Sequence, residues 1–375
     1  MYDAIVEAKK SIFWELYIIV DDEVGRPFFD ELEKKSRGGV EVKLIIDALG
    51  SSFSIPKSRL TSLREAGIDV RFFSERTHRY RGWWKSMISR THRKILIIDE
   101  RIGFIGGVNI DKRMENWLDM HAKIEGKAIR SLVRGFAKMY IICGGDKKNI
   151  SRLLRYPLHV PDESYEFIYD DADDDKSLVR RIYVDAFKKA KDRIILFTPY
   201  YFPDKAFLYA LWQARRRGVR IDLLIPFRSD LRIATYAAYA WFSFMKIIGV
   251  KIHFASRMMH GKGILVDNDW AMIGSSNIEH TSFFDNYEAN VKIKDKKAVE
   301  KVRHLLENWL LESHVFDYQR WKRRGWWQRS KEWVALKLYI TWHKKGRDIK
   351  FGHIIEEIKR RRILKGVIST EDDSQ

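Results

Sequence analysis

The sequence has a single cysteine, no long apolar run and no signal peptide. Cys143 has no second cysteine to pair with, so an internal disulfide is excluded, and no Cys/His spacing typical of structural zinc occurs. The longest apolar candidate, residues 237–250, contains Lys246 and is too short to span a bilayer. Because the first residues have no basic and no apolar region, we expect the chain to stay on the cytoplasmic side. A helical pattern begins at once, which hints at a missing upstream segment.

Acidic residues are too few to balance the basic ones. The chain has 70 Lys and Arg against 51 Asp and Glu, a net charge of +19, which favours a polyanionic partner such as nucleic acid or an anionic membrane. Many of the 13 Trp residues lie beside Lys or Arg, as in Trp83-Trp84 and Trp326-Trp327. Indole rings favour the headgroup level of a bilayer, but they also stack on unpaired bases. Composition alone leaves both partners open.

The order of predicted helices and strands occurs twice along the chain. Each half has a helix and a strand, then a helix that ends at glycine before a buried strand, then a third strand and a late helix. Strands that alternate with helices predict an α/β fold with a mixed sheet covered on both faces. The corresponding strand regions are residues 12–20 and 194–197, 39–47 and 218–225, 66–73 and 248–254, and 122–125 and 291–294.

We predict four segments along the chain. Two α/β domains, residues 1–150 and 177–314, are separated by a linker over residues 151–176. The linker is predicted from its two prolines and from the acidic run at residues 170–175, because contiguous like charges usually mark an exposed segment. A basic, Trp-rich tail at residues 315–375 has no counterpart in the first half.

The tail carries much of the net charge. Residues 320–366 hold sixteen Lys or Arg against four Asp or Glu, a charge of +12, and five Trp. Residues 331–345 form a basic amphipathic pattern, which is compatible with a helix lying in a membrane interface. The alternative is a helix that packs on the second domain and exposes a basic face to solvent.

Each half contains one motif of His, Lys and Asp at identical spacing, followed by small residues and an asparagine. In an extended segment residues two apart share a face, so the histidine and the lysine of each motif point the same way. Two histidines, two lysines and two asparagines together predict a phosphate pocket in which the cations are fixed side chains. We therefore expect neither a metal nor a cofactor. The motif residues are His92, Lys94, Asp99, Gly106-Gly107 and Asn109, and His260, Lys262, Asp267, Gly274-Ser275 and Asn277.

The paired motifs resemble the signature of the phospholipase D superfamily, and further strings over residues 4–312 are most similar to bacterial cardiolipin synthases. The resemblance implies two mixed-sheet domains packed with pseudo-two-fold symmetry around an active site at their interface. It also implies a phosphohistidine mechanism, with His92 as the nucleophile and His260 as the acid. The oxygens of the phosphate would be held by Lys94, Asn109, Lys262, Ser275 and Asn277.

Each catalytic histidine also needs a carboxylate that fixes its tautomer. Glu288 lies 28 residues after His260, where the resemblance places such a partner, and Asp119 lies 27 residues after His92. Asp99 and Asp267 belong to the motif. For these two, bracing the fold is an alternative to a catalytic role.

The resemblance implies a phosphatidyltransferase that joins two phosphatidylglycerol molecules into cardiolipin and releases glycerol. Such an enzyme would bind peripherally to an anionic phospholipid membrane, at the cytoplasmic face, and no obligate protein partner is evident. A phosphodiesterase or nuclease of the same superfamily is the alternative, for which the net charge of +19 would serve nucleic-acid binding. A non-enzymatic basic binding protein with a relic site is a third interpretation, and the two intact motifs argue against it.

Overall fold

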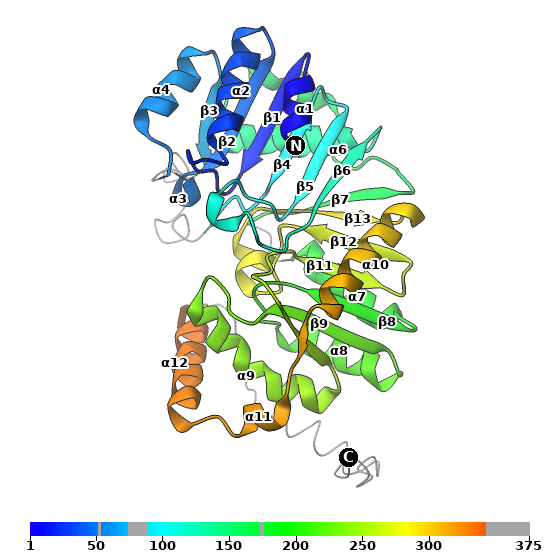
Figure 1. Ribbon diagram of the computed structural model, residues 1–375. Helices are drawn as coiled ribbons and strands as arrows, with labels where there is room; N and C mark the ends of the chain where they lie inside the picture. The colour runs from blue at the N-terminus through cyan, green and yellow to red at the C-terminus, as the bar shows by residue number, and fades with distance from the viewer. Residues whose placement is uncertain (52–53, 74–88, 173–175, 343–375) are drawn as a thin grey trace.

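The computed structural model describes residues 1–51, 54–73, 89–172 and 176–342, and Figure 1 shows two α/β halves stacked end to end. Trp83-Trp84 lies outside the described residues.

The first half contains a six-stranded mixed sheet in the order β3-β2-β1-β4-β5-β6. β1, β2 and β3 are mutually parallel, and β4 turns back antiparallel to β1. The central strands β1, β2 and β4 are almost entirely buried because helices and the second half cover both faces, whereas the edge strand β6 is largely accessible. The strands are β1 (Ser11–Leu16), β2 (Glu41–Asp47), β3 (Asp69–Phe73), β4 (Ile95–Ile98), β5 (Ile102–Gly106) and β6 (His121–Glu125); the helices are α1 (Tyr2–Glu7), α2 (Arg26–Arg37), α3 (Ala48–Ser51), α4 (Lys57–Glu65) and α6 (Ile129–Ile142).

The second half repeats this strand order and adds one strand at each edge. Its sheet runs β14-β10-β9-β8-β11-β12-β13-β7, in which the six inner strands correspond one to one with those of the first sheet. The strands are β7 (Tyr165–Asp170), β8 (Arg193–Phe197), β9 (Arg220–Pro226), β10 (Lys251–Ala255), β11 (Gly263–Val266), β12 (Trp270–Gly274), β13 (Glu288–Ile293) and β14 (His314–Val315); the helices are α7 (Leu178–Lys189), α8 (Lys205–Arg216), α9 (Arg232–Ile248), α10 (Lys296–Leu311), α11 (Tyr318–Lys322) and α12 (Trp326–Trp342). The predicted duplicated fold is confirmed.

A shared hydrophobic core joins the two halves. It contains Phe13 and Ile97 from the first sheet and Phe197 and Leu265 from the second, all essentially excluded from solvent. Phe136 of α6 stacks on Phe13 with ring centroids 5.3 Å apart. Two further cores lie on the outer faces, one under α1, α2 and α4 and the other under α7, α8 and α9. Because the middle core draws on both sheets, the halves form one packed body.

The linker predicted at residues 151–176 is wrong for its second part. Tyr165–Asp170 forms β7, which pairs antiparallel with β13 and completes the second sheet. The first residue of the acidic run, Asp170, is buried, and it accepts hydrogen bonds from the amides of Leu178 and Val179 at the start of α7. Asp171 forms ion pairs with Arg93 and with a lysine of α6. Specific partners for the first two charges therefore override the tendency of an acidic run to stay solvated.

The tail predicted to begin at residue 315 starts inside the second domain. Val315 belongs to β14, which extends the second sheet beside β10, and the amide of Phe316 donates to the carbonyl of Ile252. Beyond it, α12 packs along α9, and Ala335 contributes to the outer core of this half. The described part of the tail is therefore a helix packed on the second domain.

Candidate active site at the domain interface

Both motif histidines lie on short extended segments that pair across the domain boundary. The amide of His92 donates to the carbonyl of Tyr287 at 3.0 Å, and the amide of Tyr287 donates to Arg90 at 2.8 Å. In the same way, the amide of His260 donates to the carbonyl of Leu118 at 2.7 Å. Each motif segment therefore runs beside the segment of the other half that carries a carboxylate.

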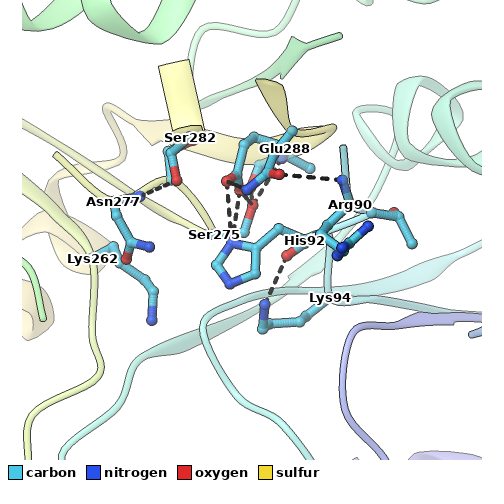
Figure 2. A network of polar contacts seen from close by, with 12 residues as sticks. Arg90, His92, Lys94, Lys262, Ser275, Asn277, Ser282 and Glu288 are labelled. Carbon is cyan, nitrogen blue, oxygen red and sulfur yellow. Dashed lines mark hydrogen bonds and ion pairs between the residues drawn. The ribbon is translucent and has the colours of Figure 1, made fainter. Parts of the chain in front are cut away.

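His92 is held by Glu288 of the opposite half. Its Nδ1 lies 3.1 Å from both carboxylate oxygens, as Figure 2 shows. The hydroxyl of Ser275 also donates to Glu288, and Asn286 donates to it at 3.5 Å. Burial opposes the negative charge of Glu288, but His92 and Ser275 lower its pKa overall. An ionised Glu288 accepts the Nδ1 proton of His92, which leaves Nε2 with a free lone pair.

His260 has the equivalent arrangement with Asp119 of the first half. Its Nδ1 lies 2.7 Å from Oδ2 of Asp119. Burial opposes ionisation of Asp119, but His260 and Lys262 lower its pKa to about 2. Where the second half has Ser275, the first has Gly107, and a Cβ there would lie 2.1 Å from Oδ1 of Asp119. Gly107 thus makes room for the carboxylate.

Each motif histidine is therefore paired with a carboxylate from the other half of the chain. The sequence places Glu288 after His260 and Asp119 after His92, yet the structure pairs Glu288 with His92 and Asp119 with His260. The reason is the backbone pairing of Thr91 with Tyr287 and of Leu118 with Met259.

The two motif lysines point into the same space as the histidine rings. Lys94 donates to the carbonyl of His92 at 2.7 Å, and Lys262 donates to the carbonyl of His260. In Figure 2 the amino groups of both lysines lie on the side of the His92 ring away from Glu288, and the amide of Asn277 lies beside the ring. Burial lowers the pKa of Lys94 to about 8 and that of Lys262 to about 7. A bound anion would relieve this cost by supplying the missing counter-charge.

Both motif asparagines are buried with part of the side chain unsatisfied. Among the described residues, neither Oδ1 of Asn109 nor Oδ1 of Asn277 has a hydrogen-bond partner. The Nδ2 of Asn277 donates to Glu279 at 3.1 Å, and the Nδ2 of Asn109 lies 3.6 Å from the sulfur of Met114. Buried polar atoms without a partner are uncommon and are expected where a ligand binds.

Burial and the nearby lysines also lower the pKa values of the two motif histidines. Burial and Lys94 lower the pKa of His92, and burial and Lys262 lower that of His260 to about 4, although the paired carboxylates oppose both shifts. Without a ligand both imidazoles are therefore neutral at pH 7. A neutral imidazole with a free Nε2 is a competent nucleophile for a phosphodiester.

Asp99 and Asp267, predicted with the catalytic residues, lie in the tight turns after β4 and β11, with φ of 52° and 51°. Asp99 accepts hydrogen bonds from the amides of Lys9, Lys10 and Ser11, and Asp267 accepts three at 2.8 Å from residues 191–193. Each carboxylate thus anchors the start of the neighbouring strand, β1 or β8. These contacts support the bracing role that the sequence left open.

We expect Asp267→Ala to reduce stability and to leave the chemistry largely intact. Loss of hydrogen bonds to a charged acceptor should lower the free energy of unfolding by about 2–4 kcal/mol. Thermal unfolding and the turnover of the folded fraction are the measurements. Unchanged stability with turnover lost by more than about a hundredfold would instead place Asp267 in the catalytic machinery.

Three residues near the site were not predicted from the sequence. Tyr17 packs edge-on against His92 at 4.9 Å, and Trp117 lies 5.7 Å from the ring of His260. Burial raises the pKa of Glu279 to about 7, although its bond from Asn277 opposes the shift. The position of Glu279, two residues after Asn277, is occupied by Asp111 after Asn109, and this repeated acid was the signal available in the sequence.

Among the residues that the structure describes, no group of three or more His, Cys, Asp or Glu side chains is arranged to hold a metal ion. Over the same ranges, no helix has both the length and the apolar character needed to cross a bilayer.

The fold is similar to that of two proteins of known structure. The phosphatidylserine synthase of Haemophilus influenzae superimposes with a TM-score of 0.65 at 13% identity, over 89% of this chain and 92% of that one. The polyphosphate kinase of Porphyromonas gingivalis gives 0.57 at 12% identity, over 85% and 46%. At these identities the likeness concerns the fold alone.

Comparison of the sequence with known proteins identifies the family. The model of the family described as cardiolipin synthase, phospholipase D-like domain, matches residues 1–140 and 183–310. Cardiolipin synthase 2 of Bacillus anthracis is 31% identical over 334 residues, which are 86% of this chain and 64% of that protein. The minor cardiolipin synthase ClsB of Bacillus subtilis is 30% identical over 349 residues, 90% of this chain and 85% of the relative. The chain belongs to the cardiolipin synthase family of phospholipase D-like proteins, as the motifs indicated.

Proposed function

We propose that this protein is a phosphatidyltransferase that converts two phosphatidylglycerol molecules into cardiolipin and glycerol. The observation that carries the proposal is the pair of histidines, each bound at Nδ1 by a carboxylate of the other half and accompanied by a buried lysine. The names of the relatives supply the lipid class. Because the chain covers only part of those proteins, the lipid substrates belong to the proposal.

The first half-reaction transfers the phosphatidyl group to His92. Nε2 of His92 attacks the phosphorus, a P–N bond forms, and the bond from phosphorus to the glycerol headgroup oxygen breaks. His260, protonated once the anionic substrate has bound, donates its proton to the leaving oxygen, and glycerol departs. Lys94 and Lys262 face the two non-bridging oxygens and stabilise the charge that accumulates on them in the transition state.

The second half-reaction reverses these roles. The primary hydroxyl of a second phosphatidylglycerol gives its proton to the now neutral His260, and its oxygen attacks the phosphorus. The P–N bond breaks, cardiolipin is released and His92 regains its lone pair. Glu288 and Asp119 keep their imidazoles in one tautomer throughout, so that neither ring has to rotate between the steps.

The enzyme would work as a peripheral protein on an anionic phospholipid membrane. The net charge of +19 complements such a surface, and we assign the cytoplasmic face because that leaflet carries the negative surface potential. The alternative function is a nuclease or other phosphodiesterase, which the same charge would also suit.

Lipid analysis of cells that express the protein tests the proposal. Mass spectrometry of extracted lipids from a strain without cardiolipin should show cardiolipin with the wild-type protein and none with His92→Ala. If no cardiolipin forms and the purified protein hydrolyses nucleic acid in a His92-dependent way, the alternative replaces the proposal.

The pH dependence of kcat/KM should reflect the ionisation of the two motif lysines. Lys262 and Lys94, with pKa values of about 7 and 8, lose their charge as the pH rises, so kcat/KM should fall by about tenfold per unit between pH 7 and 8 and by about a hundredfold per unit above pH 8, where both amines are neutral. Lys262→Arg is the matched control, because a guanidinium stays charged and should move this decline to higher pH. Rates on short-chain phosphatidylglycerol between pH 5 and 10 give the profile. A profile for the wild type that stays flat to pH 10 would contradict the assignment.

A further inference from the structure

α12 exposes three tryptophan side chains and buries an acid. Trp326, Trp327 and Trp333 are 63%, 66% and 61% exposed, whereas Glu332 is 4% exposed. At 100° per residue, Trp326 and Trp333 lie about 180° and 160° from the buried Ala335 and about 120° and 100° from Glu332, so both tryptophans point away from the inward side of the helix. A helix packed on a domain normally directs its large apolar side chains to the core, so three outward tryptophans need an explanation.

The inward acid has specific partners that fix this orientation. Arg324 donates through Nε and Nη2 to Glu332 at 2.9 and 2.8 Å, and Gln328 donates to it at 3.2 Å. The guanidinium of Arg324 also lies 3.4 Å above the ring of Trp321. Because the buried carboxylate is paired, rotating α12 to hide its tryptophans would break this network.

The exposed face of α12 is also basic. Arg329, Lys331 and Lys337 are exposed on it, and the amino group of Lys337 lies 5.6 Å from the ring centre of Trp333. From Trp326 to Lys337, the one acid is the buried Glu332. Exposed tryptophans among lysines and arginines, without exposed acids, match the headgroup region of an anionic bilayer.

Further exposed apolar residues lie at the end of the sheets that carries the active site. Leu49 follows β2 directly, and Phe227 and Leu231 follow β9; their exposures are 54%, 53% and 55%. These positions are at the carboxyl ends of parallel strands, and His92 and His260 precede β4 and β11, which run antiparallel to them. The motif histidines and these three side chains therefore share one end of the sheets.

α12 continues this surface. It lies along α9, which starts just after Leu231, and Figure 1 shows α3, the start of α9 and α12 on the same side of the molecule. We propose that the outward face of α12, with Leu49, Phe227 and Leu231, is a docking surface for an anionic lipid bilayer that presents the lipid to the active site. The identity of the bound lipid rests on the proposed function, whereas docking itself does not.

The test is binding of the full chain to vesicles. Sedimentation with vesicles of phosphatidylglycerol and phosphatidylcholine, at low and high salt, is measured for wild type and for Trp326→Ala/Trp327→Ala/Trp333→Ala. We expect the triple variant to bind at least tenfold more weakly to phosphatidylglycerol vesicles. Neutralising Arg329, Lys331 and Lys337 to Gln should remove much of the salt dependence of binding. The matched control is Leu305→Ala/Leu311→Ala, which removes exposed apolar side chains from α10 and should not change binding.

Two further measurements make each outcome decisive. Thermal unfolding and turnover of short-chain phosphatidylglycerol should be equal in all variants, because the described part of α12 packs mainly on α9. Unchanged vesicle binding in the triple variant overturns the proposal. The proposal is also overturned if the triple variant changes its oligomeric state in analytical sedimentation. It is overturned as well if the triple variant loses binding to an oligonucleotide but still binds vesicles. Vesicle binding that depends on α12 in a protein without transferase activity would retain the docking surface and reject the proposed function.

Discussion

His92→Ala and His260→Ala each lower the rate of phosphatidyl transfer by at least about 10³-fold, and the two variants fail at different steps. Both side chains are buried at the domain interface and both are fixed at Nδ1. Without His92 no phosphoenzyme can form. Without His260 the leaving glycerol receives no proton, but the nucleophile is still present.

A substrate with a leaving group that needs no proton separates the two steps. With the p-nitrophenyl ester of phosphatidic acid, His260→Ala should release one equivalent of p-nitrophenol in a burst and accumulate a phosphatidyl adduct, detected by mass spectrometry of acid-quenched protein. His92→Ala should show neither the burst nor the adduct. If His92→Ala formed an adduct on His260 and His260→Ala formed none on His92, His260 would be the nucleophile and His92 the acid.

The matched control for both variants is another buried histidine that pairs with a carboxylate. His253 lies 3.0 Å from Asp222 in the second domain, on β10 and away from the motif segments. His253→Ala removes a buried imidazole of the same kind, so it accounts for any loss of stability. It should retain the burst and the turnover of its folded fraction.

Sequence periodicity and repetition predicted most of the fold, because strands buried on both faces give continuous apolar runs. The residues around Ile97 and Leu265 are such runs, and they recur with the same motif spacing. The repetition also predicted that His92 and His260 would converge. Pairing between segments far apart in the chain could not be predicted, since it depends on how the halves meet. The exchange of Glu288 and Asp119 between the histidines is therefore visible only in the structure.

Local charge patterns predicted the fold less well than the apolar pattern did. The acidic run at residues 170–175 predicts a solvated linker, but Asp170 caps α7 and Asp171 pairs with Arg93. The basic pattern of the tail predicts an amphipathic helix without saying which face packs. In the structure Arg324 pairs with Glu332, and this pair fixes the buried side of the helix. A single ion pair of this kind gives no periodic pattern in the sequence.

Glu288→Gln and Asp119→Asn should each lower the rate by about 10²–10⁴-fold with little change in structure. Each substitution keeps the size of the side chain but removes the charge that accepts the Nδ1 proton, so the imidazole can adopt the wrong tautomer. The charged form of the ring also loses its support, which slows any step in which it carries a proton. Rates on short-chain phosphatidylglycerol are the first measurement, with Asp222→Asn as the matched control beside His253.

The crossed pairing gives this prediction a second, residue-specific signature. In protein with ¹⁵N-labelled histidine, the chemical shifts of Nδ1 and Nε2 report which nitrogen is protonated. Glu288→Gln should change the shifts of His92 and leave those of His260, because only His92 lies 3.1 Å from that carboxylate. Asp119→Asn should do the reverse. If Glu288→Gln moved the resonances of His260, each carboxylate would serve the histidine of its own half, and the interface that joins the two motifs would have to be arranged differently.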